Sequence, residues 1–211
     1  MCTGGEFSEK GITNLLRQSA DLLMESNMYE SVDKVYNLLS KIYLSRRNNH
    51  YLGGLHRNLH TAYEKMYHMG KKRQMGCYFR VAFYGEKFND LNGVTMIYKE
   101  KPFTKLPEIA HRLQNMYYEQ FGDEFEFISD SKRIDPDTID TYRAYVQVTY
   151  VEPFFEDYEK KYRKEDFEYS YNVDRFYYST PFTHSGSAHG AVGEQFKRVT
   201  VLTTEFSFPY V

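Results

Sequence analysis

The sequence predicts an α+β protein in which antiparallel helices of a repeat-like lobe precede an antiparallel β-sheet lobe with one clear helix. Up to about residue 75, apolar residues recur at the three- and four-residue spacing of helices, whereas from Gly76 onward they mostly alternate as in strands. Between Gly76 and Gly85 this alternation involves aromatic and β-branched residues, which is typical of a strand. We therefore divide the chain into residues 1–75 and 76–211.

Three amphipathic helices are expected in the first part, with apolar stripes running over 12–23, 29–43 and 52–66. The polar breaks between them, at 26–27 and 47–49, are short, which predicts antiparallel neighbours as in a helical-repeat array. Such arrays need about three repeats and a polar cap, so we expect an exposed apolar edge on the N-terminal side. The pair Gly53-Gly54 falls within the third helix and indicates either a close helix contact or a break.

In the second part, alternation predicts a series of strands and one helix. The expected strands are 76–85, 94–98, 125–128, 145–151, 175–182 and 196–208. Asn92-Gly93 reads as a hairpin turn before the second strand. The helix spans 105–121, with Pro107 in its first turn and Gly122 at its end. The charged segment 156–166 is either helical or solvated, and 183–190 is a Gly- and Ser-rich connection.

Composition narrows the class of protein. The 27 Lys and Arg residues against 29 Asp and Glu give a net charge of −2, which argues against nucleic acid as a partner. With two cysteines, the sequence predicts neither a disulfide framework nor a zinc site, and this fits a reducing compartment. No apolar run approaches the roughly 20 residues of a transmembrane helix, and the first residues lack a secretory signal, so we expect a cytoplasmic protein.

The residues that could carry chemistry form no coherent set. His56, His60, Glu64 and His68 share one helical stripe, but the zinc-protease motif requires Glu directly after the first His, where this chain has Arg57. No phosphate-binding glycine loop occurs. We therefore expect no catalytic residue, metal or cofactor. The 21 Tyr and 16 Phe suit either protein recognition or β-rich packing.

Several segments together resemble the Dock family of guanine-nucleotide exchange factors, closest to its zizimin and zizimin-related branches. These segments are 20–23, 29–36, 75–88, 97–100, 109–113, 144–155, 180–183, 194–198, 202–204 and 208–210. The resemblance implies the end of a helical-repeat lobe, which can form homodimers, followed by a sheet lobe that grips the first switch of a Rac- or Cdc-type Rho GTPase. It also implies a third lobe that expels nucleotide, for which this sequence has no matching position before Val211.

The resemblance therefore predicts a fragment of an exchange factor, or a short form that binds a Rho-family GTPase with weak or no exchange. The alternative is a non-catalytic scaffold or dimerisation module. Because exposed aromatic residues at strand ends are good contact residues, we expect partner contacts at Pro153, Phe154, Phe155, Phe182 and His184. The other interpretation of Phe154 and Phe155 is that they simply close the core of the sheet.

Overall fold

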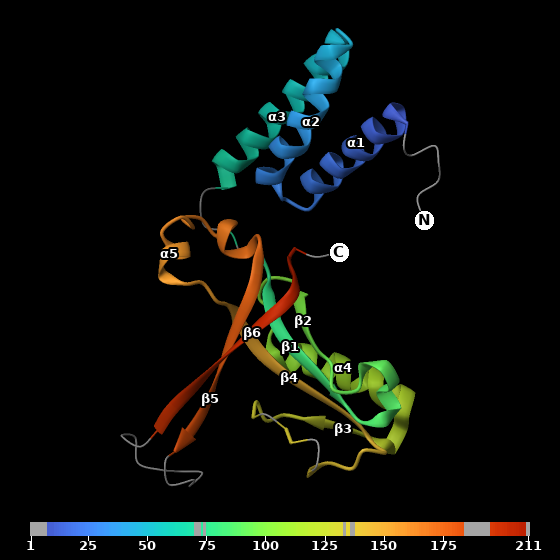
Figure 1. Ribbon diagram of the computed structural model, residues 1–211, viewed down its shortest axis with the longest axis vertical. Helices are drawn as coiled ribbons and strands as arrows, with labels where there is room; N and C mark the ends of the chain where they lie inside the picture. The colour runs from blue at the N-terminus through green and yellow to red at the C-terminus, as the bar shows by residue number, and fades with distance from the viewer. Residues whose placement is uncertain are drawn as a thin grey trace. The chain divides into compact units, whose positions relative to one another are not determined.

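The computed structural model describes residues 8–69, 73, 75–132, 134–135, 138–183 and 195–209. The chain divides into two compact units, Met1–Arg73 and Gln74–Val211. Helices make up the first unit, and a curled, mainly antiparallel sheet with one long helix makes up the second (Figure 1). This arrangement confirms the predicted α+β fold class.

The helical unit consists of α1 (Glu9–Glu25), α2 (Tyr29–Ser45) and α3 (Asn49–Met69). Both interhelical turns use the same geometry: Asn27 and Arg47 adopt positive φ, and the following N–H returns to a carbonyl five residues earlier. Both α1 and α3 pack on α2, around a core to which each helix contributes. The core residues are Ala20, Val32, Tyr36, Leu39, Tyr43 and Leu55.

Apolar residues on α1 remain outside this core. Ile12, Leu15 and Leu22 are 44%, 44% and 64% exposed, respectively. The helical unit therefore has the exposed apolar edge that its short repeat pattern predicts.

The sheet unit contains β1 (Cys77–Tyr84), β2 (Thr95–Glu100), β3 (Phe125–Ile128), β4 (Ala144–Pro153), β5 (Val173–Thr183) and β6 (Gln195–Phe208). The strand order is β2-β1-β4-β5-β6 with antiparallel pairing throughout, while β3 lies beside β4 and is parallel to it. Gly93, with φ +78°, turns the chain into β2 as expected, although the connection from β1 also holds the short 3₁₀ helix Glu86–Leu91.

The helix α4 (Leu106–Phe121) covers one face of β1 and β4, which confirms the predicted helix. Its buried residues Ile109, Leu113 and Tyr117 pack with Phe79, Val81 and Phe83 of β1. We call this set, with the β4 residues Ala144, Val146 and Val148, the helix-side core.

A second core lies where β5 and β6 meet the rest of the sheet. The pair β5–β6 forms a long two-stranded arm that crosses the other strands (Figure 1). Six buried residues fill the junction and define the arm-side core, namely Tyr78, Val151, Phe155, Val173, Phe176 and Tyr178. Both β1 and β4 contribute residues to the two cores, so these two strands connect them.

The backbone conformation and the close packing at both ends of β1 require the glycines Gly76 and Gly85. A Cβ on Gly85 would lie 1.8 Å from the Arg143 carbonyl oxygen, and its φ is +104°. At Gly76 a Cβ would lie 2.7 Å from the Glu100 carbonyl oxygen, with φ +136°. No L-residue fits either position without displacing backbone.

Candidate functional site

The end of β4 places Pro153, Phe154 and Phe155 at the base of the arm. Pro153 pairs with Phe176 of β5, and the Phe154 N–H donates to the Arg175 carbonyl over 2.8 Å. The Phe154 ring is half-buried, and the Arg175 guanidinium lies over it at 5.4 Å. Phe154 therefore presents part of one ring face to solvent and has a cation beside it.

Phe155 points the other way, into the arm-side core. It is 6% exposed, packs edge-on against Tyr169 at 5.6 Å and has the Arg163 guanidinium 4.0 Å above its ring. A side chain in this position supports the neighbouring surface by fixing the end of β4.

Charged side chains fix the base of the arm. Arg175 reaches the carboxylates of Glu156 and Glu159, which are the N-cap residue and a first-turn residue of the short helix α5 (Asp157–Lys160). The Glu156 N–H and then Arg175 hold the pKa of Glu159 below its ordinary value. On the same face, the Tyr177 hydroxyl donates to Glu152 over 2.5 Å, and this hydrogen bond raises the pKa of Tyr177. The base of the arm is thus a polar, partly acidic surface whose charged side chains form ion pairs and hydrogen bonds with one another.

Phe182 lies toward the far end of the arm. Its ring is half-buried, 5.8 Å from the ring of Phe196 on β6, with the Arg198 guanidinium 5.2 Å from its centroid. His184 lies outside the described residues.

The predicted contact residues are therefore not all brought together. Phe182 is roughly 20 Å along β5 from Phe176, at ~3.3 Å per residue. It also shares a face of the arm with Phe176, whereas Phe154 packs against Tyr177 on the opposite face. They define two surfaces, one at each end of the arm.

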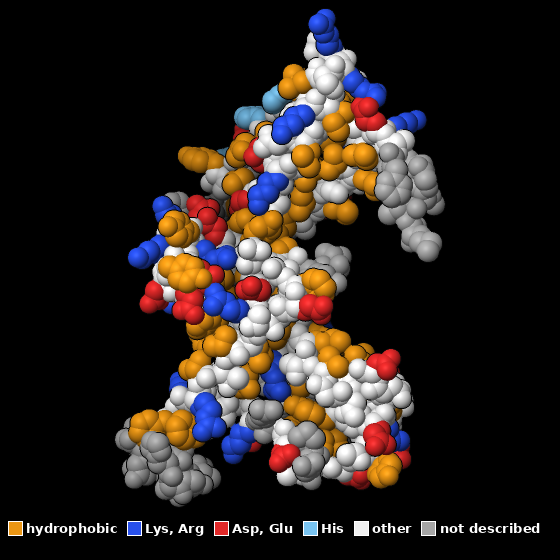
Figure 2. Space-filling model, viewed as in Figure 1, with side chains coloured by type: hydrophobic (Ala, Val, Ile, Leu, Met, Phe, Trp, Pro, Cys, Tyr) orange, Lys and Arg blue, Asp and Glu red, His pale blue; other side chains and the backbone are white. Residues whose placement is uncertain are grey.

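The far half of the arm carries exposed side chains that the sequence reasoning did not single out. Phe196, Val199 and Val201 are 43%, 56% and 43% exposed, and Lys197 and Arg198 lie among them. Hydrophobic and basic side chains gather at this end of the arm (Figure 2). Phe196 and Arg198 share the face that carries Phe182, whereas Lys197, Val199 and Val201 lie on the opposite face of the arm. Residues 176–183 and 195–204 include no acidic side chain, so both faces of this part of the arm are apolar and basic. The sequence signal that could have indicated these exposed residues is that β6 carries apolar side chains on both of its faces.

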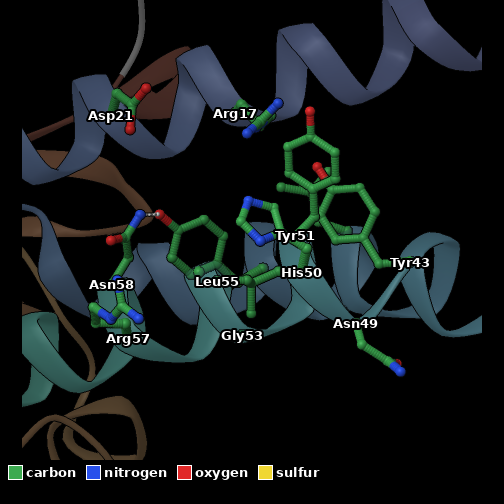
Figure 3. Close-up of a pocket in the computed structure, with 13 residues that line it drawn as sticks. Arg17, Asp21, Tyr43, Asn49, His50, Tyr51, Gly53, Leu55, Arg57 and Asn58 are labelled. Carbon is green, nitrogen blue, oxygen red and sulfur yellow. Dashed lines mark hydrogen bonds between the residues drawn. The ribbon is translucent and has the colours of Figure 1, made fainter. Parts of the chain in front are cut away.

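The helical unit has a groove of about 600 Å³ lined by all three helices. Arg17 of α1 lies over the ring of Tyr51 at 4.6 Å, and Asn58 of α3 donates to the Tyr36 hydroxyl over 3.3 Å (Figure 3). Gly53 and Gly54 line the groove with nothing within 4 Å of their Cβ positions, and α3 continues through them. The expected close contact or helix break at these glycines is therefore wrong.

No catalytic arrangement emerges within the parts of the chain that the structure describes. His60 lies 3.5 Å from Glu64 on the exposed face of α3, and no three His, Cys, Asp or Glu side chains of the described residues converge as a metal site. No described helix combines the length and apolar character needed to cross a membrane. The described residues form a helical unit and a unit built on a curled sheet.

Comparison with known proteins identifies the family. The family model "DHR-2, Lobe A" matches residues 1–68, and "DHR-2, Lobe B" matches residues 131–207. Dedicator of cytokinesis protein 7 of Mus musculus is 46% identical over 214 residues, covering 100% of this chain and 10% of that protein. Dedicator of cytokinesis protein 8 of Homo sapiens is 44% identical over 212 residues, with the same coverage. Human dedicator of cytokinesis protein 9 is 41% identical over 224 residues, covering 97% of this chain and 11% of that protein.

The chain therefore belongs to the Dock (dedicator of cytokinesis) family, with residues 1–68 matching lobe A and residues 131–207 matching lobe B of the DHR-2 region. It spans about a tenth of the length of the curated relatives it matches.

Proposed function

We propose that this chain is part of a guanine-nucleotide exchange factor for Rho-family GTPases and that its sheet unit binds the GTPase switch region. Its membership of the Dock family supports this proposal. We place the interaction in the cytoplasm, with a Rac- or Cdc-type GTPase as the partner.

The observation that carries the proposal is the surface of the arm. An exposed apolar surface with aromatic residues and arginine has the composition of a protein-binding site. On one face of the arm Phe182 and Phe196 supply apolar area and Arg198 supplies positive charge, with no acidic residue among 176–183 and 195–204. A partner surface that is apolar and acidic complements it. Phe154 and Pro153 would form a second contact at the base.

Exchange itself requires no covalent chemistry. A factor that binds the nucleotide-free GTPase more tightly than the nucleotide-bound form lowers the affinity for nucleotide by the same ratio. The sheet unit would supply binding energy in this cycle, and nucleotide release by this chain alone would be slow.

The test is a panel of Rho GTPases, each measured nucleotide-free and loaded with fluorescent GDP. We expect the chain to bind at least one nucleotide-free GTPase in biolayer interferometry, with little acceleration of GDP release. The double variant Phe182→Ala/Phe196→Ala should weaken binding at least tenfold, because these two side chains lie opposite each other on one face of the arm and hot-spot side chains each contribute about 1–2 kcal/mol or more. Met116→Ala is the matched control, since Met116 is 46% exposed on α4, away from the arm. Failure to bind any member of the panel would refute the proposal.

A scaffold or dimerisation role is the second candidate, and the exposed apolar residues of α1 favour it. Light scattering separates the two. A monodisperse dimer without affinity for any GTPase supports the scaffold, whereas a complex that forms only with GTPase supports the exchange-factor role.

A further inference from the structure

Arg80, in the middle of β1, is a buried cation that has no counterion among the residues that the structure describes. It is 5% exposed, and its two Nη groups donate to neutral acceptors, Gln147 Oε1 at 2.8 Å and the Tyr84 hydroxyl at 3.2 Å. None of the carboxylates in the described residues forms an ion pair with it. Arg73, whose side chain is comparably buried, does pair with a carboxylate, that of Glu30. Arginine is rarely buried unless it is paired, so Arg80 requires an explanation.

The neighbours of Arg80 hold it in place. The Gln147 side chain is fully buried, and its amide nitrogen donates to the carbonyls of Asp130 and Lys132, the latter at 2.8 Å. Because those bonds occupy the amide nitrogen, the amide oxygen is directed at Arg80. On the other side the Tyr178 ring of β5 lies 5.5 Å from the guanidinium carbon. The guanidinium is therefore preorganised, with two of its five N–H groups used in these bonds.

A second polar group beside Arg80 also lacks a partner. Thr149 lies directly opposite Arg80 on β4, so the two side chains share a face of the sheet. Its hydroxyl is buried and makes no hydrogen bond with the described residues. A buried guanidinium that has no carboxylate partner among the described residues lies beside a buried hydroxyl that makes no hydrogen bond with them, and a carboxylate would bind both groups.

This face of the sheet continues onto β2, which is an edge strand. Ile97 is opposite Arg80 on β2 and is half-buried, while Thr95, further along the same face, is exposed. Lys99 lies on the same face, half-buried, and burial lowers the pKa of its ammonium group. A side chain that reached Arg80 from the β2 edge would pass Lys99 and Ile97.

We propose that Arg80 and Thr149 form a receptor for an Asp or Glu side chain of the protein that binds the sheet unit. The inference rests on the proposed function, since the GTPase would supply the carboxylate. A planar carboxylate fits the guanidinium fork in bidentate fashion and neutralises one buried charge, whereas a phosphate group would bring more negative charge than this single buried cation balances.

In this proposal the positive charge of Arg80 contributes to partner binding and not to the stability of the fold, so Arg80→Met tests it. We expect this variant to keep a thermal midpoint equal to or above that of the wild type, because a buried unpaired charge is removed. We also expect its affinity for the nucleotide-free GTPase to fall at least tenfold. Arg112→Met is the control, because Arg112 is half-exposed on α4 and already paired with Glu100; its affinity should not change.

A second variant guards against loss of the fold. Thr149→Val preserves shape and removes a hydroxyl that has no partner, so the protein should fold normally and bind the GTPase about threefold or more weakly. If wild type binds a GTPase and both Arg80→Met and Thr149→Val bind equally well, the receptor is refuted while the proposed function stands.

A titration that needs no GTPase separates the remaining cases. The side-chain Nε–H signal of Arg80, assigned by its loss in Arg80→Met, should shift on addition of acetate and saturate, while that of Arg112 should follow only the ionic strength. A shift with inorganic phosphate but not with acetate would refute the carboxylate assignment, and no shift with either would refute the receptor itself. If no GTPase binds but acetate does, the proposed function fails and the receptor stands.

Discussion

Replacing Phe176 by alanine should separate the arm from the rest of the sheet. Phe176 is fully buried in the arm-side core, with ring centroids 5.0 Å from Tyr78 and 5.4 Å from Phe208. Truncating a buried phenylalanine costs ~3–5 kcal/mol, a large part of the ~5–15 kcal/mol that stabilises a typical domain. Because the helix-side core has no residue in common with the arm-side core, that loss should be confined to the arm.

Native-state hydrogen exchange measures this directly. In Phe176→Ala we expect amides of β5 and β6 to lose protection by about 3–5 kcal/mol, with β1 and the first half of β4 nearly unchanged. Phe79→Ala is the matched control, since Phe79 is fully buried in the helix-side core; it should expose β1 and β2. Equal loss of protection over all strands in Phe176→Ala would show that the sheet unit has one cooperative core and would refute the reasoning.

Three further predictions concern backbone geometry and pH. Arg47→Gly should raise the stability of the helical unit by about 0.5–1 kcal/mol in thermal denaturation, because Arg47 has φ +53° and glycine adopts it without strain; a lower midpoint would contradict this. Gly85→Ala should prevent folding of the sheet unit, which near-UV circular dichroism would detect. Gly93→Ala should cost only about 1–2 kcal/mol, because Gly93 has φ +78° but no atom within 4 Å of its Cβ position; equal effects of the two variants would contradict the close packing at Gly85. Burial raises the pKa of Tyr78 to about 12, so the contribution of its neutral hydroxyl to stability is fully present below pH 10 and is lost as the pH rises toward 12. In urea denaturation, Tyr78→Phe should reduce that loss by about 2–3 kcal/mol, and an unchanged pH dependence would argue against this explanation.

The local pattern of apolar, glycine and proline residues was sufficient to predict most helices and strands of the fold. The helices follow from the apolar spacing, and α4 was predicted from Pro107 and Gly122 at its ends. The parallel pairing of β3 with β4 was not predicted, because a four-residue strand contains no information about which distant strand it will join. The glycine pair in α3 was misinterpreted for a related reason: sequence shows that glycine is present but not whether anything approaches it.

The candidate site was predictable only in part. Alternation along β5 places Phe182 and Phe176 on one face, but the register that puts Pro153 opposite Phe176 is a long-range property. Phe154 and Phe155, which follow the last residue of β4, have different environments, half-buried and buried, that a repeated Phe-Phe in the sequence does not distinguish. Arg80 shares an alternating face with Tyr78 and Ala82, which suggests a half-wet surface; only the fold shows that β5 and the Asp130–Lys132 segment cover it.

The central claim is that the sheet unit binds a Rho-family GTPase, and a hydrogen-exchange footprint of this chain with nucleotide-free GTPase tests it most directly. We expect slower exchange along the arm, at 176–183 and 195–204, and along β1 and β2 near Arg80. Protection confined to α1, α2 and α3, or no protection with any member of the GTPase panel, would contradict it.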